Sequence, residues 1–411
     1  MSEKQPEKKK KRLKTAEKLG KLMADYYTES AMIKAQKKPV AWLTSVAPVE
    51  ICYAMDVFPV YPENYATVCA ARNLSAEFCA AAEAKGFSTD LCSYALNNFG
   101  SIYLNKGPFM GQGIPEPDML IATEHACLSM AKWWEELARH FDVPLYVVDA
   151  SLPVGDEIAP YQVKYFADQL KELAEFVEKH SGNKFDMDKF KEVLTYSDEA
   201  SALFLEVADL RKTVPSPVSP IEMFTNMFPL VTLAGKKESV DFYREFLEEI
   251  KDLASKKVPA VPNEKYRLIW DLFPVWYNLK LFKYLEERGG VVVADVYATA
   301  FGGSIDISRP FEGLAERYVG NPLLSFGVQE QTELYKQIIK DFHVDGIIFH
   351  SNRSCRMASM GQYDVKQGIY EDLGIPGAVF ESDFVDPRTY SDEQVKDTLD
   401  SFFEILESKK Q

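Results

Sequence analysis

Apolar residues follow two kinds of spacing along the first part of the chain. Short apolar runs of strand length begin the segments 39–45 and 57–64, each of which ends in a turn, and also occur at residues 118–123 and 144–150. Residues 128–141 have the apolar spacing of a helix. Successive strands of a parallel sheet need a crossover between them, which is usually a helix. The alternation therefore predicts an α/β fold with a parallel sheet.

The middle of the chain has a different pattern. Residues 161–257 carry long helical patterns, broken at "VPSPVSP" (214–220), because closely spaced prolines cannot lie within one helix. A second alternating set begins near "YRLIWDLF" (266–273) and continues with strand-like runs at residues 290–297, 345–350 and 377–383. We expect two parallel-sheet lobes, Rossmann-like or flavodoxin-like, joined by a helical region.

This pattern predicts four segments. They are a charged helical arm (1–36), an N-terminal α/β domain with candidate ligands (37–160), a helical insert (161–260) and a C-terminal α/β domain (261–411).

Several candidate residues follow directly after predicted strands. Ser45, Glu63, Cys127 and Cys355 each lie just past an apolar run. Ligands of open α/β sheets bind beyond the carboxyl ends of the strands. We therefore expect these side chains to face one cleft.

Charge narrows the classes of partner. The chain has 411 residues and a formal net charge of −15, which argues against nucleic acid as the main partner. The basic run at residues 8–14 predicts a solvated helix start or arm, with docking to an acidic partner as the alternative. No apolar stretch reaches the roughly 18 to 20 residues of a membrane span, and no apolar segment follows the basic N-terminus as in a secretory signal. We expect a cytoplasmic chain, in which disulfides are unusual.

Common motifs are missing from the sequence. It contains no Walker-type phosphate loop, no G-x-G-x-x-G, no C-x-x-C and no G-x-S-x-G. A nucleotide-binding loop, a zinc ribbon, a redox dithiol and a serine nucleophile elbow are therefore not indicated.

The six cysteines fall into two groups. Cys92 follows a Ser-Thr-Asp turn, Cys127 lies where a strand gives way to a helix, and Cys355 lies in the polar "HSNRSCRMASMGQ" just past "DGIIF". A helix N-terminus favours a thiolate. These three could converge on one metal centre, and isolated thiols are the alternative. The others are predicted to be buried in helical segments: Cys52, Cys69 and Cys79.

Glu63 and Ser45 are the acid/base candidates outside the cysteines. Tyr61 and Tyr65 flank Glu63 and could desolvate it, which would raise its pKa. A solvated turn carboxylate is the alternative. Ser45 could instead cap the helix that follows it. His125 could donate to a bound carbonyl or to backbone.

Several segments together resemble a known family. They resemble the larger-type subunit of the 2-hydroxyacyl-CoA dehydratases, whose superfamily also contains the ATP-dependent benzoyl-CoA reductases. The resemblance runs from about Lys38 to the C-terminus and rests on these segments: "SVAPVEICYAMDVFPVYPEN", "GFSTDLCSYALNNFG", "PEPDMLIATEHACLSMAKWWEEL", "DGIIFHSNRSCRMASMGQ" and "ESDFVDPRTYS".

The resemblance implies a site and a reaction. It implies a [4Fe–4S] cluster held by Cys92, Cys127 and Cys355 with one iron open, and Ser45 and Glu63 beside it. A separate activator hydrolyses ATP and delivers one electron, and water leaves an (R)-2-hydroxyacyl-CoA through a ketyl radical to give an enoyl-CoA. The resemblance also implies a heterodimer with a homologous second subunit.

Two alternatives remain open. "AERYVGNPLLSFGVQEQ" (315–331) lacks the extra cysteines of double-cubane or reductase members, which favours the single-cluster dehydratase. "ESDFVDPRTYS" and "MAKWWE" are also close to the reductase branch, so an aryl-CoA reductase subunit is one alternative. A cluster-free paralogue that acts only as a partner is the other.

Polar neighbours of Cys355 could tune such a cluster. Ser351, Asn352 and Ser354 are candidates for hydrogen bonds to its sulfides. Arg353 and Arg356 could offset its negative charge or meet the CoA phosphates.

Overall fold

The computed structural model describes residues 12–109, 111, 113–124, 127–151, 158–325 and 327–410. Within these residues the strands form two four-stranded sheets that are parallel throughout, so the α/β class with two parallel-sheet lobes is confirmed. The N-terminal sheet has the order β2-β1-β3-β4 and the C-terminal sheet β6-β5-β7-β8. The strands are β1 (Val40–Leu43), β2 (Phe58–Val60), β3 (Met119–Thr123), β4 (Leu145–Val148), β5 (Tyr266–Asp271), β6 (Gly290–Asp295), β7 (Gly346–Asn352) and β8 (Gly377–Ser382).

The strands are largely apolar because helices cover both faces of each sheet. Every residue of β1, β3, β5 and β6 is buried. Trp42 of β1 pairs with Val60 and Leu120, which fixes the register of three neighbouring strands. The carboxyl ends of these strands therefore lie along one edge.

The N-terminal lobe begins with a helix that packs against the helical region. Glu249 accepts hydrogen bonds from the backbone and hydroxyl of Thr15, at 3.0 and 2.7 Å, so the described part of the charged arm is docked. The "YPEN" segment does not form a turn, because Pro62 occupies the first position of a helix. The helices of this part are α1 (Thr15–Met32), α2 (Glu50–Ala54), α3 (Pro62–Ala71), α4 (Ser75–Glu83), α5 (Ser93–Leu104) and α6 (Leu128–Phe141).

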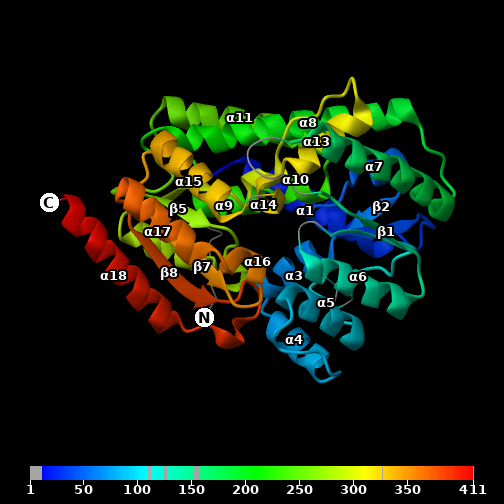
Figure 1. The fold of residues 1–411 in the computed structure, drawn as a ribbon, viewed down its shortest axis with the longest axis horizontal. Helices are drawn as coiled ribbons and strands as arrows, with labels where there is room; N and C mark the ends of the chain where they lie inside the picture. Colours follow the sequence, from blue (N-terminus) through cyan, green and yellow to red (C-terminus); the bar gives the residue numbers. More distant parts are fainter. Residues whose placement is uncertain are drawn as a thin grey trace, which may run out of the picture.

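Long helices connect the two sheets. Figure 1 places α7, α8 and α11 along one side of the molecule, above both lobes. The "VPSPVSP" break lies between η1 and α9, and Ser219 and Glu222 form a capping box at the start of α9. The elements here are α7 (Pro160–Ser181), α8 (Met187–Asp209), η1 (Leu210–Lys212), α9 (Pro220–Asn226), α10 (Phe228–Thr232) and α11 (Lys237–Ser255).

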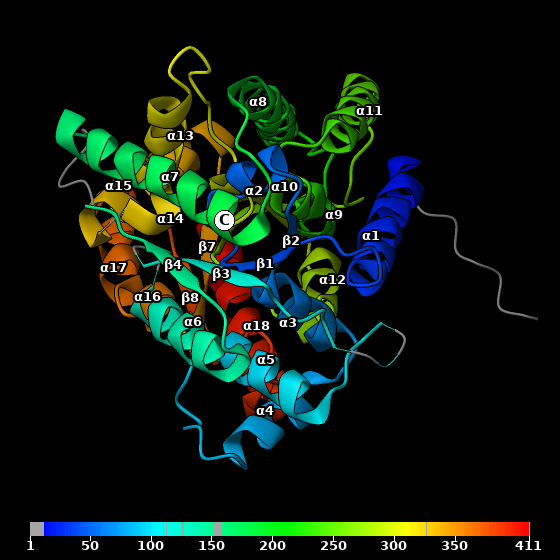
Figure 2. The same cartoon turned by 90° about the vertical axis from the view of Figure 1, so that its right-hand side faces the viewer.

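The C-terminal lobe surrounds its sheet with helices, ending in α18 along its outer side (Figures 1 and 2). Its elements are η2 (Trp276–Asn278), α12 (Lys280–Glu287), η3 (Thr299–Phe301), α13 (Pro310–Val319), α14 (Pro322–Ser325), α15 (Val328–Phe342), α16 (Arg356–Ser359), α17 (Gln362–Leu373), η4 (Pro387–Thr389) and α18 (Asp392–Lys410). The boundaries of the four sequence segments stay a prediction. None of the described helices is long and apolar enough to cross a membrane.

Buried polar contacts tie the lobes to the helical region. The fully buried Glu50 of α2 accepts hydrogen bonds from Ser197 of α8 at 2.8 Å and from Tyr318 of α13 at 3.1 Å. Arg211 and Asp295 form a second buried pair at 2.7 Å. Breaking one partner of such a pair leaves an uncompensated buried charge. These contacts therefore favour one arrangement of the two lobes.

Candidate active site

Each of the three candidate cysteines lies directly before a helix. Cys127 follows β3 and is the N-cap of α6, and Cys355 follows β7 and is the N-cap of α16. β3 and β7 hold the same place in their sheets, so these two cysteines occupy equivalent positions in the two lobes. Cys92 is the N-cap of α5, in the connection between β2 and β3.

The three cysteines converge on one cavity of about 600 Å³ at the junction of the lobes. Burial raises the pKa of Cys92, and the nearby thiols of Cys355 and Cys127 raise it further. Burial also raises the pKa of Cys355 to about 11, although a hydrogen bond from the backbone N–H of Ala358 lowers it. The fold therefore brings all three cysteines to the lining of one cavity.

Thiol groups are soft donors, so the chemistry of the three cysteines suits a soft metal group. The sulfur ligands of a single tetrahedral zinc ion would lie about 3.8 Å apart. Among the described residues, no three His, Cys, Asp or Glu side chains are grouped closely enough to hold one metal ion. Three thiols that line one cavity, with backbone N–H groups at hand, have the donor chemistry of thiolate ligands to a soft metal group.

Glu63 lies in the first turn of α3 with its carboxyl group in the same cavity. It is 7% exposed, so the alternative of a solvated turn carboxylate is wrong. Burial raises its pKa to about 7, and hydrogen bonds from the backbone and side chain of Ser45 oppose that rise. A carboxyl group with this pKa populates both protonation states near neutral pH.

Ser45 binds Glu63 and does not cap the next helix. Its backbone N–H donates to Oε2 of Glu63. The N-cap of α2 is Val49, without a side-chain cap, so the capping role expected as one alternative for Ser45 is wrong. β1 and β2 are neighbours, which explains why residues just beyond them meet.

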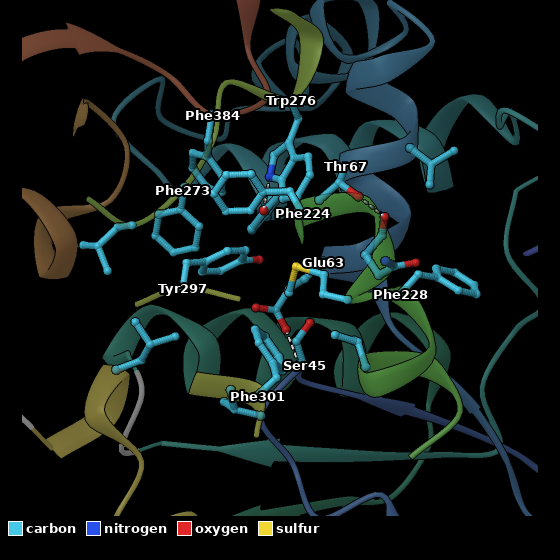
Figure 3. A pocket seen from close by; sticks show the side chains of 18 of the residues that line it. Ser45, Glu63, Thr67, Phe224, Phe228, Phe273, Trp276, Tyr297, Phe301 and Phe384 are labelled. Atoms are coloured by element: carbon cyan, nitrogen blue, oxygen red, sulfur yellow. Dashed lines mark hydrogen bonds between the residues drawn. The ribbon is translucent and has the colours of Figure 1, made fainter. Parts of the chain in front are cut away.

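Aromatic side chains of the C-terminal lobe face Glu63 (Figure 3). Trp276 donates to the hydroxyl of Tyr94 at 2.9 Å, so the proton of Tyr94 must point elsewhere. The hydroxyl of Tyr297 interacts with Tyr94, and the charge of Glu63 contributes to raising the pKa of both tyrosines, after burial. Sequence reasoning missed Tyr297, although it follows β6 as Glu63 follows β2.

A buried carboxyl group links the loops of two cysteines. Ser93 donates to Oδ1 of Asp383 at 2.6 Å, and Ser354 donates to Ser93 at 3.1 Å. Asp383 also accepts from the backbone of Val385 at 2.9 Å and of Asp386 at 2.8 Å. Asp383 belongs to "ESDFVDPRTYS", so this segment joins the lobes directly behind Cys92 and Cys355.

The remaining sequence candidates separate clearly. Arg353 is exposed, and its Nη1 lies 3.6 Å from Oε1 of Glu381. A role of Arg353 in binding CoA stays a prediction. Asn352 accepts a hydrogen bond from the backbone of Ser354 at 3.2 Å. His125 lies outside the described residues. The predicted burial of three cysteines is confirmed, since each is 0% exposed: Cys52, Cys69 and Cys79.

Comparisons with known proteins define the family. The family model for 2-hydroxyglutaryl-CoA dehydratase, D-component, matches residues 44–406. The chain is 32% identical to the (R)-2-hydroxyisocaproyl-CoA dehydratase alpha subunit of Clostridioides difficile, covering 95% of each chain. It is 31% identical to the (R)-phenyllactyl-CoA dehydratase alpha subunit of Clostridium sporogenes, covering 92% of each. The chain therefore belongs to the 2-hydroxyglutaryl-CoA dehydratase D-component family.

Two further similarities bear on function. A benzoyl-CoA reductase subunit of Thauera aromatica is 29% identical, over 88% of this chain and 87% of its own. The beta subunit of the same phenyllactyl-CoA dehydratase is 24% identical, over 59% of this chain and 64% of its own. The names of these relatives support a dehydratase-type enzyme and a partner subunit of related sequence.

Proposed function

We propose that this chain is the [4Fe–4S] subunit of an ATP-activated radical dehydratase that removes water from an (R)-2-hydroxyacyl-CoA to give an enoyl-CoA. The observation that carries the proposal is one cavity that contains Cys92, Cys127, Cys355 and Glu63. Family membership and the dehydratase relatives support it.

The cysteines would hold the cluster, two from the N-terminal lobe and one from the C-terminal lobe. A cluster with three protein ligands supplies an open iron that can polarise a thioester carbonyl and exchange an electron with the substrate. Backbone N–H groups at the helix starts favour the thiolate forms that metal binding requires. Ser93, next to Cys92, accepts a hydrogen bond from Ser354, next to Cys355, and donates one to Asp383, so the two cysteine segments are tied together.

Glu63 would move the protons of the reaction. With a pKa raised to about 7, it can donate a proton as the 2-hydroxyl group leaves and accept one from the β-carbon. Ser45 fixes one carboxylate oxygen, which leaves the other toward the cavity. The aromatic wall around Tyr297 excludes water from the reacting carbons.

Two partners belong to the proposal. The similarity to the beta chain of a dehydratase supports a heterodimer with a homologous second subunit. The sequence has no phosphate-binding loop motif, so ATP would be hydrolysed by a separate iron–sulfur activator.

An assay that counts the electrons consumed for each product formed tests the proposal. The anaerobic chain, its second subunit, the activator, ATP and a reductant are supplied with a 2-hydroxyacyl-CoA or with benzoyl-CoA. We expect many turnovers of dehydration for each electron consumed, because dehydration returns the electron. Stoichiometric reduction of benzoyl-CoA would instead establish the aryl-CoA reductase, which the similarity to the benzoyl-CoA reductase of Thauera aromatica favours as the second candidate.

A further inference from the structure

We infer that the cavity selects a bulky, uncharged acyl chain, branched or aromatic, and excludes one that ends in a carboxylate. The inference rests on the proposed function and names the substrate class of the same site. It follows from the wall beyond Glu63, from the hydrogen bonds of that wall, and from the position of Arg72.

Aromatic and aliphatic side chains form the wall beyond Glu63. Phe228 and Val231 of α10 lie on one side, so the helical region supplies part of the cavity, and Phe224 of α9 packs beside Tyr297 with ring centroids 6.4 Å apart. Phe273 and Tyr297 of the C-terminal lobe lie on the other side (Figure 3). Such a wall gains free energy by covering apolar substrate surface.

Three hydroxyl groups near this wall already have hydrogen-bond acceptors. The hydroxyl of Thr67 donates to the backbone oxygen of Asn64 at 2.7 Å, and that of Thr225 donates to Ile221 at 2.7 Å. Tyr27 donates to the side-chain oxygen of Asn64 at 2.6 Å. These hydroxyl groups cannot donate to a substrate carboxylate without giving up their present partners.

The one basic side chain among the described lining residues lies beyond the far end of α3 from Glu63. Among the described lining residues, only Glu63 and Arg72 have an acidic or basic side chain. Arg72 lies nine residues after Glu63, directly beyond the end of α3, so its Cα atom is about 13 Å from that of Glu63 along the helix axis. Its guanidinium is 5.6 Å from the ring centroid of Phe109 and 3.5 Å from the carbonyl of Pro108.

This distance separates short dicarboxylates from apolar chains. In a glutaryl chain, three carbon–carbon bonds join the second carbon to the distal carboxyl carbon, a span of about 4 Å. With its second carbon at Glu63, the distal carboxylate would be buried against aromatic rings, near a second carboxyl group and without a counter-ion. Burying an unpaired charge in this way is costly.

Binding of unreactive thioesters tests the inference. The full chain, purified anaerobically, is titrated with 5-methylhexanoyl-CoA and glutaryl-CoA, which match in shape but differ in charge, and with 3-phenylpropanoyl-CoA. We expect both uncharged thioesters to bind at least about tenfold more tightly than glutaryl-CoA. Equal or tighter binding of glutaryl-CoA would overturn the inference and leave the proposed function standing.

A variant distinguishes selection of the acyl chain from a general change in the structure of the site. Val231→Phe should weaken 3-phenylpropanoyl-CoA at least about tenfold and leave acetyl-CoA within about twofold, because only the longer chain reaches the wall. Equal weakening of both would contradict the role of this wall. If none of these thioesters binds the unaltered chain, the proposed function fails together with the inference.

Discussion

The two lobes share one strand order but bring different chemistry to the cavity. Beyond β1 and β2 of the N-terminal sheet lie Ser45 and Glu63, whereas beyond β5 and β6 lie Phe273 and Tyr297. The cysteines beyond β3 and β7 are the feature that the lobes have in common. One sheet thus carries the acid/base group and the other an aromatic wall.

Each lobe also has a buried carboxyl group near a strand end, and the two differ in what surrounds them. Burial raises the pKa of Asp271 to about 6, as it raises that of Glu63 to about 7. Both oxygens of Asp271 are taken, one by the hydroxyl of Tyr335 and one by Gln362. Glu63 lines the cavity and Asp271 does not. A raised pKa therefore marks a reactive group only where the carboxyl group can meet a ligand.

Replacing each carboxyl group with its amide should give the largest difference in kcat between the two positions. Glu63→Gln removes the group that moves protons, so we expect kcat to fall by about 10² to 10⁴. Asp271→Asn leaves the lining of the cavity unchanged, so kcat should stay within about threefold. Turnover of the anaerobic enzyme, compared with its unfolding midpoint, measures both. A Glu63→Gln variant with full turnover would contradict the role of Glu63.

The pH dependence of stability sharpens the same comparison. An unfolded Glu63 titrates near 4.5 and the folded one near 7, so burial costs nothing below pH 4.5, and its cost grows between 4.5 and 7 and is complete above 7. Glu63→Gln should thus stabilise the iron-free chain at pH 8 by up to about 3 kcal/mol, and not at pH 4.5. Urea unfolding at both values measures this. A variant that is equally stable or less stable at pH 8 would contradict the raised pKa.

Weakening the Asp383–Ser93 hydrogen bond between the lobes should reduce iron binding more than it reduces the stability of the fold. Asp383→Asn weakens the hydrogen bonds to Ser93 and to backbone, at a cost of about 1 to 3 kcal/mol, and should lower iron content and alter the electron paramagnetic resonance spectrum. Glu83→Gln is the matched control, because it weakens the more exposed contact with Arg388 between the same lobes. Unchanged iron and spectrum in Asp383→Asn would refute this link.

The smallest expected effect is on the aromatic side. Trp276→Phe removes the hydrogen bond to Tyr94 and should cost about 1 kcal/mol of stability. It should also raise KM for the thioester more than it lowers kcat, because Tyr94 and Tyr297 lose their fixed orientation while Glu63 is untouched. A fall in kcat alone would contradict this division of roles.

Local patterns were sufficient to predict the two sheets and the cysteines at their edges. Apolar runs identify parallel strands, and strand order brings Ser45 near Glu63. The sequence did not indicate Asp383, because its partner Ser93 is 290 residues away. Phe228 and Tyr297 were missed because the sequence does not distinguish an aromatic residue that lines a cavity from one in the core.

The central claim is that cysteines of both lobes bind one cluster. Iron and spectra should be measured on the anaerobically purified chain, on Cys355→Ser, and on Cys52→Ala as a control in the core. We predict a brown protein with about four iron atoms per chain. Cys52→Ala should keep the iron and Cys355→Ser should lose it. A colourless, iron-free chain, or full iron in Cys355→Ser, would contradict the claim.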